Sequence, residues 1–169
     1  MQHNYHFKIG NAVKNIGREF ETLLDPACGG KSNIPLFLSK SKGNDTEICN
    51  VDVLILKGNI PFVVIEIEES SILPTKIHGK FMNVLMSKYL IHSNGYTKCL
   101  NNLLFIQVIS DSMLPSNSKK KRQFENMKEV ILNSRLLKIG LSITGYKLFM
   151  SSDLKNNLSI LVNAIKEKK

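Results

Sequence analysis

Three acidic residues within two apolar strands constrain this sequence more than any other feature. The stretch from Val51 to Glu69 reads VDVLILKGNIPFVVIEIEE, a pattern that predicts two strands joined by a short turn. Asp52 lies in the first strand, and Glu66 and Glu68 lie at the end of the second. Ionised carboxylates are rarely buried among Val, Ile and Leu without a partner. Because Lys57 at the turn is the only cationic side chain of this stretch, a divalent cation with oxygen ligands is the expected partner.

The geometry of the turn decides whether the three acids meet. Side chains alternate along a strand, so Glu66 and Glu68 share a face and lie about 6.5 Å apart along the chain. A two-residue turn at Gly58-Asn59 would place Asp52 and Glu66 on opposite faces of the sheet. Convergence of the acids therefore requires an odd-length loop or a bulge near residues 57 to 61.

Composition favours a globular protein with a polyanionic partner. The chain has 169 residues, which suits one domain, residues 1–169, and 43% of them are hydrophobic. Lys and Arg number 23 against 14 Asp and Glu, a net charge of +9. This excess favours nucleic acid before a membrane surface, and the alternative is a basic protein with no such partner.

The cysteines and the lack of long apolar runs favour a cytoplasmic location. Cys28, Cys49 and Cys99 are far apart and form no CxxC pair, which argues against a disulfide framework or a zinc site and fits a reducing, cytoplasmic environment. The first ten residues lack the apolar run of a signal peptide. We also find no apolar stretch of the roughly 18 residues that a membrane span needs.

Periodicity predicts an α/β fold with a mixed central sheet. Helices are expected over residues 11–24, 75–92, 119–138 and from Ser152 or Asp153 to the KEKK end. Strands are expected over residues 34–39, 47–56, 60–68, 103–109 and 141–150. Residues 1–10 are expected to form an arm or a loose lead-in. The hairpin must be antiparallel, whereas the later crossovers allow parallel pairing.

The acids resemble a known signature. The run NVDVLIL, a spacing of 14 residues to Glu66 and the run IEIE are similar to the motif of the PD-(D/E)xK nuclease superfamily. The resemblance implies a restriction-endonuclease-like αβββαβ core over about residues 11–109, with a helix-strand-helix extension over about 119–169. It also implies that Asp52 and Glu66 bind Mg²⁺, for which Mn²⁺ is expected to substitute.

Two positions depart from the family pattern. Glu68 stands where the family usually has lysine, and Val51 stands where it has proline. A subgroup of type II restriction enzymes carries glutamate at the lysine position, as a metal ligand or as a base for the attacking water. We therefore assign Glu68 to the metal site, in either role, together with Asp52 and Glu66.

A further acid is expected from the first helix. The run GREFE resembles the GxxxE pattern of resolvases and related nucleases and indicates Glu21 as a supporting catalytic residue. Glu19 is the rival, because both residues flank the apolar stripe of the expected helix. The alternative for each is an ordinary solvated acid.

Two basic groups are candidates for nucleic-acid binding. Lys76 and Lys80 share a helix face just after the acids, where they could contact phosphate or replace the missing lysine in charge. The second group could grip the DNA backbone and consists of Lys119, Lys120, Lys121 and Arg122. A solvated surface is the alternative for both. We expect His78 and His92 to be structural or surface residues, and Gln107 to be a hydrogen-bonded core residue.

These features together predict a Mg²⁺-dependent DNA endonuclease, most like a small type II restriction enzyme. Water would attack the scissile phosphate while the acids hold one or two metal ions. Cleavage of both strands usually needs two sites, so a homodimer is expected. The alternatives are a structure-selective resolvase or repair nuclease, a non-catalytic DNA-binding protein on the same fold, and an enzyme that acts on RNA.

Overall fold

The computed structural model describes residues 4–70, 72–92, 97–111, 114, 119–138, 141–154 and 157–168. The helices are α1 (Asn4–Lys14), α2 (Pro74–Met86), α3 (Lys119–Asn133), α4 (Ser151–Leu154) and α5 (Ser159–Lys166), with a 3-10 helix η1 (Arg135–Lys138). The strands are β1 (Phe20–Leu24), β2 (Ile34–Phe37), β3 (Glu47–Val51), β4 (Val53–Lys57), β5 (Ile60–Glu68), β6 (Tyr89–Ile91), β7 (Thr97–Cys99), β8 (Leu103–Ile109) and β9 (Ile143–Met150).

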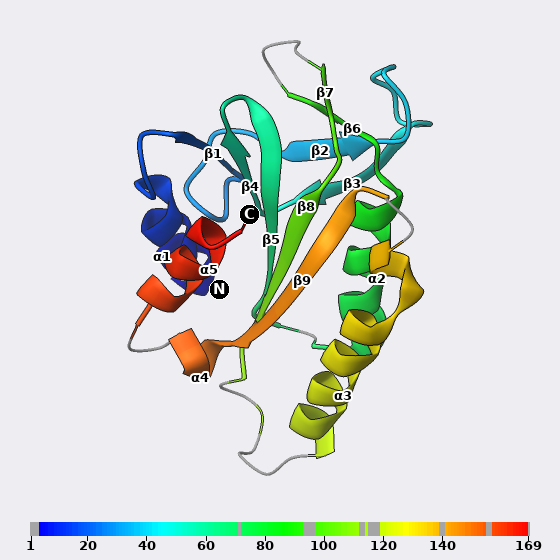
Figure 1. The fold of residues 1–169 in the computed structure, drawn as a ribbon. Coiled ribbons are helices and arrows are strands. Elements are labelled where there is room, and N and C mark those ends of the chain that lie inside the picture. The colour runs from blue at the N-terminus through cyan, green and yellow to red at the C-terminus, as the bar shows by residue number, and fades with distance from the viewer. Residues whose placement is uncertain are drawn as a thin grey trace.

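A mixed sheet forms the centre of the fold (Figure 1). Its strand order is β1-β4-β5-β8-β9. Strands β1, β4 and β5 pair antiparallel, and β5, β8 and β9 pair parallel. A smaller antiparallel sheet has the order β3-β2-β6-β7. The predicted α/β class and the mixed central sheet are therefore confirmed.

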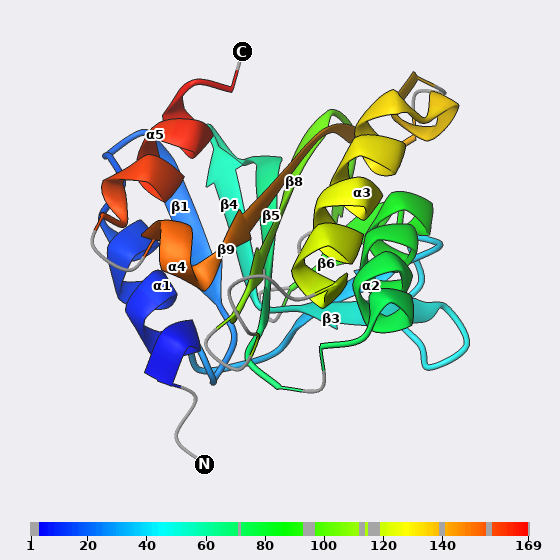
Figure 2. The same ribbon diagram turned by 90° about the horizontal axis from the view of Figure 1, so that it is seen from below.

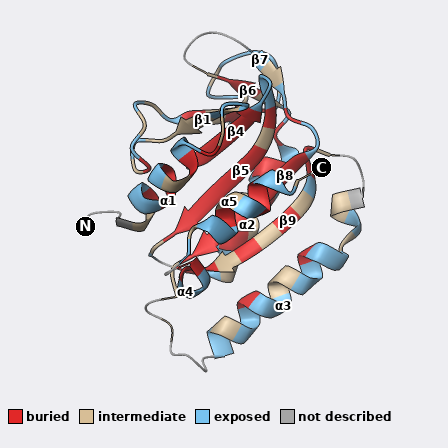
Figure 3. Cartoon of the chain, turned by 60° about the vertical axis from the view of Figure 1, so that its left-hand side comes forward, coloured by how far each residue is buried: buried red, intermediate tan, exposed pale blue. Residues whose placement is uncertain are grey.

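Helices cover both faces of the main sheet (Figure 2). Helices α2 and α3 lie on one face, and α1, α4 and α5 lie on the other. Successive strand residues point to opposite faces, so each strand supplies both cores. Val64 and Phe105 belong to the core under α2, and Ile65 and Ile106 belong to the core under α1 and α5. Burial on both faces explains why all seven residues of β8 are buried. In Figure 3 the neighbouring strand β5 is likewise mostly red.

The expected first helix over residues 11–24 is wrong in its bounds. Helix α1 ends at Lys14, and Phe20–Leu24 instead pairs with β4 as strand β1. The chain turns at Gly17, whose carbonyl accepts the N–H of Phe20 at 3.1 Å. The expected loose lead-in is also corrected from residue 4 onward, because the start of α1 packs on the sheet through residues such as Ile9, which is fully buried.

A close approach of backbones fixes α1 against the following loop. A Cβ added at Gly10 would lie 2.1 Å from the carbonyl oxygen of Cys28. Only glycine lacks that atom, so no other residue fits at this contact without a backbone shift. The middle of α1 is thereby held against the loop that contains Cys28.

Other expected elements also differ in extent. The expected single strand over 47–56 is two strands, β3 in the smaller sheet and β4 in the main sheet. The expected strand over 34–39 is β2, which joins the smaller sheet rather than the main one. The expected helix over 75–92 ends at Met86, and Tyr89–Ile91 forms strand β6. The Ser87 backbone is extended and its hydroxyl bonds the Asn83 carbonyl at 2.8 Å, which ends the helix. Within the described residues, the expected last helix comprises two helices, α4 and α5.

The β4–β5 hairpin has the irregularity that convergence of the acids requires. Gly58 and Asn59 form its two-residue turn with positive φ values of 55° and 69°. Leu56 pairs with Pro61, whereas the next pair is Ile55 with Val63, so the pairing shifts by one residue. This bulge places Asp52 and Glu66 on the same face of the sheet, whereas a two-residue turn alone would have placed them on opposite faces.

Candidate functional site

The three acids of the hairpin meet beside helix α2. Asp52 lies between β3 and β4, where the chain passes from the smaller sheet to the main sheet. Val53 pairs with Ile65, so the register continues to Asp52 beside Glu66. Glu66 and Glu68 are both only 2% exposed, and they lie on the face of β5 that α2 covers. The bulge thus brings together the side chains that the sequence singled out.

Asp52 is held by the strand it faces. Its Oδ2 accepts the backbone N–H of Ile67 at 2.6 Å. Ile67 lies between Glu66 and Glu68 on β5, and Asp52 immediately precedes β4, which pairs with β5. This hydrogen bond to a charged acceptor fixes the carboxylate beside the two glutamates.

The ammonium group of Lys80 lies among the acids. Its Nζ is 2.5 Å from Glu66 Oε2, 2.6 Å from Glu68 Oε1 and 3.7 Å from Asp52 Oδ2. Lys76, about one helical turn earlier on α2, places its Nζ 2.6 Å from Glu68 Oε2. Lys76 and Lys80 were expected to contact phosphate or to replace the charge of the missing lysine. In the structure both ammonium groups contact the carboxylates of the cluster.

Burial and mutual repulsion perturb these groups. Burial raises the pKa of Glu66 well above its ordinary value, and the neighbouring Asp52 carboxylate raises it further, while Lys80 opposes both. Burial alone would lower the pKa of Lys80, but the carboxylates of Glu66 and Asp52 outweigh burial and raise it. Lys80 therefore keeps its proton, and three carboxylates face the two ammonium groups of Lys76 and Lys80.

The donor set fits a divalent metal ion. Carboxylate oxygens from Asp52, Glu66 and Glu68 are the ligands that Mg²⁺ and Mn²⁺ prefer. Glu68 Oε1 is buried and accepts no hydrogen bond of regular geometry, although Lys80 Nζ lies close to it. Because this oxygen is ion-paired with Lys80, a metal ion that bound it would have to displace the ammonium group. In the described part of the chain, no three or more His, Cys, Asp or Glu side chains are arranged to hold a metal ion as they stand.

His6 and Glu69 extend the cluster and are absent from the sequence prediction. His6 Nδ1 lies 2.7 Å from Glu69 Oε2, and His6 Nε2 lies 3.7 Å from Asp52 Oδ2. The other oxygen of Glu69 accepts the Tyr5 N–H at 2.6 Å at the start of α1. A carboxylate that binds Nδ1 directs Nε2 outward, as in many metal-binding histidines. The available sequence signal was the spacing of Tyr5, Ile9 and Val13, which marks a helix that begins before residue 11.

Glu21, the expected helix acid, lies apart from the other three. It is exposed on β1 and pairs with Leu56 of β4, four residues along the chain from Asp52. Four strand residues span about 13 Å. Glu19, its rival, is exposed in the turn before β1. The structure therefore brings neither glutamate to the cluster, because residues 20–24 form a strand and not the expected helix.

The basic start of α3 lies at the same end of the main sheet as the acids (Figure 1). Strands β5, β8 and β9 all run toward this end, and α3 begins there. Lys119, Lys120 and Arg122 line an open hollow of about 610 Å³ together with Gln123 and Asn126. The described surface thus offers cationic groups at the end of the main sheet where the acids lie.

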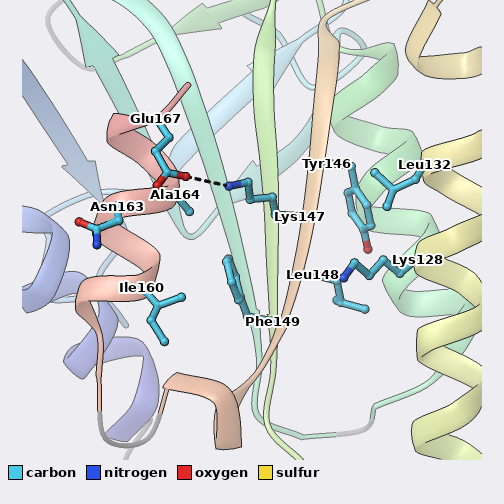
Figure 4. Close-up of a pocket in the computed structure, with 10 residues that line it drawn as sticks. All are labelled: Lys128, Leu132, Tyr146, Lys147, Leu148, Phe149, Ile160, Asn163, Ala164 and Glu167. Atoms are coloured by element: carbon cyan, nitrogen blue, oxygen red, sulfur yellow. Dashed lines mark ion pairs between the residues drawn. The ribbon is translucent and has the colours of Figure 1, made fainter. Parts of the chain in front are cut away.

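A second hollow lies on another side of the molecule. It has a volume of about 500 Å³ and runs along β9 between α3 and α5, as Figure 4 shows. It contains the ion pair of Lys147 with Glu167, whose atoms are 3.8 Å apart. Among the described residues that line this hollow, none is an acid of the cluster beside α2.

The remaining polar residues of the prediction have separate places. His92 Nε2 lies 3.4 Å from Ser32 Oγ near the smaller sheet, and His78 is half-buried on α2. Gln107 is buried on β8 and hydrogen-bonded at both ends of its amide, which confirms its expected core position. Cys28, Cys49 and Cys99 are free thiols.

Comparisons with protein-family models, with curated proteins and with solved structures each found no match for this chain. The helices within the described ranges include none with the length and apolar character that a membrane crossing requires.

Proposed function

We propose that this chain is a Mg²⁺-dependent DNA endonuclease with a restriction-endonuclease-like core. One observation carries the proposal: three carboxylates from a strand hairpin converge on a lysine, and two of them are buried. Such a concentration of perturbed titratable groups costs folding free energy and is typical of functional sites. The excess of cationic residues in the chain supports a polyanionic substrate.

The order of elements supports the resemblance to the PD-(D/E)xK superfamily. Around the main sheet the chain passes through α1, β1, β4, β5, α2 and β8 in turn. This is the αβββαβ order of the family, with the first core strand at Phe20–Leu24 instead of at the expected residues 34–39. Asp52 immediately precedes the second strand of that core, and Glu66 and Glu68 lie on the third.

The acids would hold the metal ion and Lys80 would supply the family's missing cation. Asp52 and Glu66, with Glu68, provide the ligand oxygens, and His6 offers one nitrogen beside Asp52. A divalent cation supplies Lewis-acid chemistry that polarises the phosphate and stabilises the leaving oxygen. The Lys80 ammonium, which projects from α2 rather than from β5, neutralises charge on the phosphate and orients a water molecule.

DNA would approach from the end of the sheet where α3 begins. The cationic side chains of Lys119 to Arg122 contact the phosphate backbone independently of sequence. Cleavage of both strands of a duplex at one position requires two such sites, which favours a homodimer of this chain. A junction-specific resolvase would use the same site on a four-way substrate.

A second candidate is a DNA-binding protein without catalysis. The observation that favours it is the pairing of the acids with Lys80 and Lys76, which already compensates much of their charge. In that case the ion pairs would stabilise the position of α2 and would not yield to a metal ion.

Cleavage of supercoiled plasmid separates these functions. The purified protein is expected to nick or linearise plasmid with Mg²⁺ or Mn²⁺, and EDTA or Asp52→Asn is expected to abolish cleavage. Glu21→Gln is the matched control, since it removes an exposed acid on β1, the strand that pairs with β4. Preference for four-way junctions over linear duplex would indicate the resolvase. DNA binding without cleavage of plasmid, junction or RNA in either metal would refute the proposed enzyme.

A further inference from the structure

A polar side chain interrupts the most buried strand of the molecule. Gln107 lies in LLFIQVI of β8 and is 1% exposed. An amide buried without hydrogen bonds would destabilise the fold, and an apolar residue of similar size would avoid that cost. The contacts that this amide makes therefore indicate what it does.

The amide of Gln107 links the sheet to helix α2. Gln107 is the register partner of Glu66, so both side chains lie on the face that α2 covers. Its Nε2 donates to the carbonyl oxygen of Ile77 at 3.0 Å. Ile77 lies between Lys76 and Lys80 in the first turns of α2. The hydrogen bond thus holds the part of the helix that carries both lysines.

Tyr146 fixes the direction of this amide. Its hydroxyl group donates to Gln107 Oε1 at 2.8 Å, and the side chain is 4% exposed. Figure 4 shows Tyr146 projecting from β9 toward the side of α3, whereas Lys147 projects toward α5. With Oε1 bound by a donor, the amide must present its NH₂ group to α2. Tyr146, Gln107 and Ile77 therefore form a directed chain of two hydrogen bonds.

The opposite end of α2 has an anchor of its own. Ser142 is buried, and its hydroxyl group lies 2.7 Å from the Val84 carbonyl and 2.9 Å from the Leu85 carbonyl. Two buried side chains thus hold α2: Gln107 near the start of the helix and Ser142 in its last turn. Of these two, the Gln107 anchor is the one that lies beside the lysines.

We propose that Gln107, oriented by Tyr146, is a positioning residue that sets the reach of Lys80 and Lys76 to the acids. This role rests on the proposed function, in which Lys80 is the catalytic cation. Without the hydrogen bond to Ile77, the first turns of α2 can shift relative to the sheet, while Ser142 still holds its last turn. The Lys80 ammonium then leaves its position 2.5 Å from Glu66 Oε2. A displacement of about 1 Å at a catalytic group can lower a rate by about 100-fold.

The experiment compares three variants that each remove a buried hydrogen bond. Gln107→Met and Tyr146→Phe remove the proposed relay, and Ser142→Ala removes the other anchor as the matched control. We expect Gln107→Met to lower kcat by about 10- to 100-fold at saturating DNA and metal, with KM for DNA nearly unchanged. Tyr146→Phe should lower kcat less, and Ser142→Ala by no more than about threefold at a similar decrease in Tm.

A second readout is independent of catalysis. The ¹⁵N–¹H NMR signal of the Lys80 ammonium, assigned with Lys80→Arg, is expected to shift and to exchange faster in Gln107→Met and Tyr146→Phe but not in Ser142→Ala. An unchanged Lys80 signal in both relay variants, or equal decreases of kcat in all three, would overturn the positioning role. If the wild-type protein cleaves nothing, the proposed function fails and this signal alone decides the inference. Tyr146→Phe decides it if Gln107→Met does not fold.

Discussion

Two carboxylates lie at the same edge of the main sheet and have opposite surroundings. Glu66 is on β5, and Asp111 follows β8. The Asp111 carboxylate accepts hydrogen bonds from the Ser151 hydroxyl group at 2.7 Å and from the Ser152 N–H at 2.9 Å. Burial tends to raise the pKa of Asp111, but these bonds outweigh it and lower the pKa. Glu66 meets another acid and a lysine instead, and its pKa is raised.

The difference separates a structural carboxylate from a candidate functional one. Neutral donors satisfy Asp111, which caps the short helix α4 and needs no cation. The charge of Glu66 is compensated only by another charge, so its surroundings depend on which cation is present. Proximity to the carboxyl ends of parallel strands is common to both residues and does not by itself mark a catalytic group.

The largest expected difference between the two residues is in cleavage. Glu66→Gln should lower the single-turnover cleavage rate by at least about 100-fold, because it removes a metal ligand. Asp111→Asn keeps the size of the side chain and should change that rate by less than about threefold. Equal rates for the two variants would remove the distinction between the two carboxylates.

Lys80 provides a second way to test the cluster. Lys80→Met removes the ammonium that competes with a metal ion, so the affinity for Mn²⁺ should rise while the cleavage rate falls by about 10- to 100-fold. Isothermal titration and single-turnover kinetics measure the two effects. Lys76→Met is the control, because Lys76 is 44% exposed and pairs with Glu68; its effects should be smaller. A decrease of metal affinity in Lys80→Met would contradict the competition.

The pH dependence of stability should have opposite signs at the two carboxylates. The pKa of Glu66 is raised. In the metal-free protein, the contribution of Glu66 to the free energy of unfolding is therefore fully present below the ordinary pKa of 4.5, and it is lost as the pH rises through the raised pKa. Asp111 has a lowered pKa, so its contribution is present above 3.8 and is lost at lower pH. Glu66→Gln should therefore be more stable than wild type at pH 8 in EDTA. Denaturant unfolding from pH 3 to 8 measures this, and a Glu66→Gln variant less stable than wild type at pH 8 would contradict it.

The smallest expected effect concerns DNA binding beside this edge. Replacing Lys119, Lys120 and Arg122 with Gln should reduce the slope of log K against log salt by about 0.9 for each DNA phosphate that these side chains neutralise. Fluorescence anisotropy with a duplex measures the slope. Lys14→Gln, an exposed position on α1, should leave it unchanged. An unaltered slope in the triple variant would place DNA elsewhere on the molecule.

Local patterns were sufficient to predict the central strands and the grouping of the acids. The runs IPFVVIEIE and LLFIQVI have the predicted bounds of β5 and β8, because apolar runs bounded by turn-forming polar residues leave few alternatives. Convergence of the acids was expected to require an odd-length loop or a bulge in the hairpin. The bulge opposite Ile55 and Leu56 brings Asp52 and Glu66 to one face of the sheet.

The errors arose where tertiary contacts decide the local structure. Leu23 and Leu24 fit a helical stripe as well as a strand, and pairing with β4 selects the strand. Tyr89–Ile91 is too short for a sequence signal, and its pairing with β2 separates it from the helix. The His6–Glu69 contact joins residues 63 positions apart, which no local pattern encodes.

Metal binding tests the central claim most directly. Isothermal titration of Mg²⁺ and Mn²⁺ should give saturable binding to the wild-type protein and to Asp111→Asn, and binding should be abolished in Asp52→Asn and Glu66→Gln. An absence of saturable binding to the wild-type protein, or equal binding in all four proteins, would contradict the assignment of these acids to a metal-dependent site.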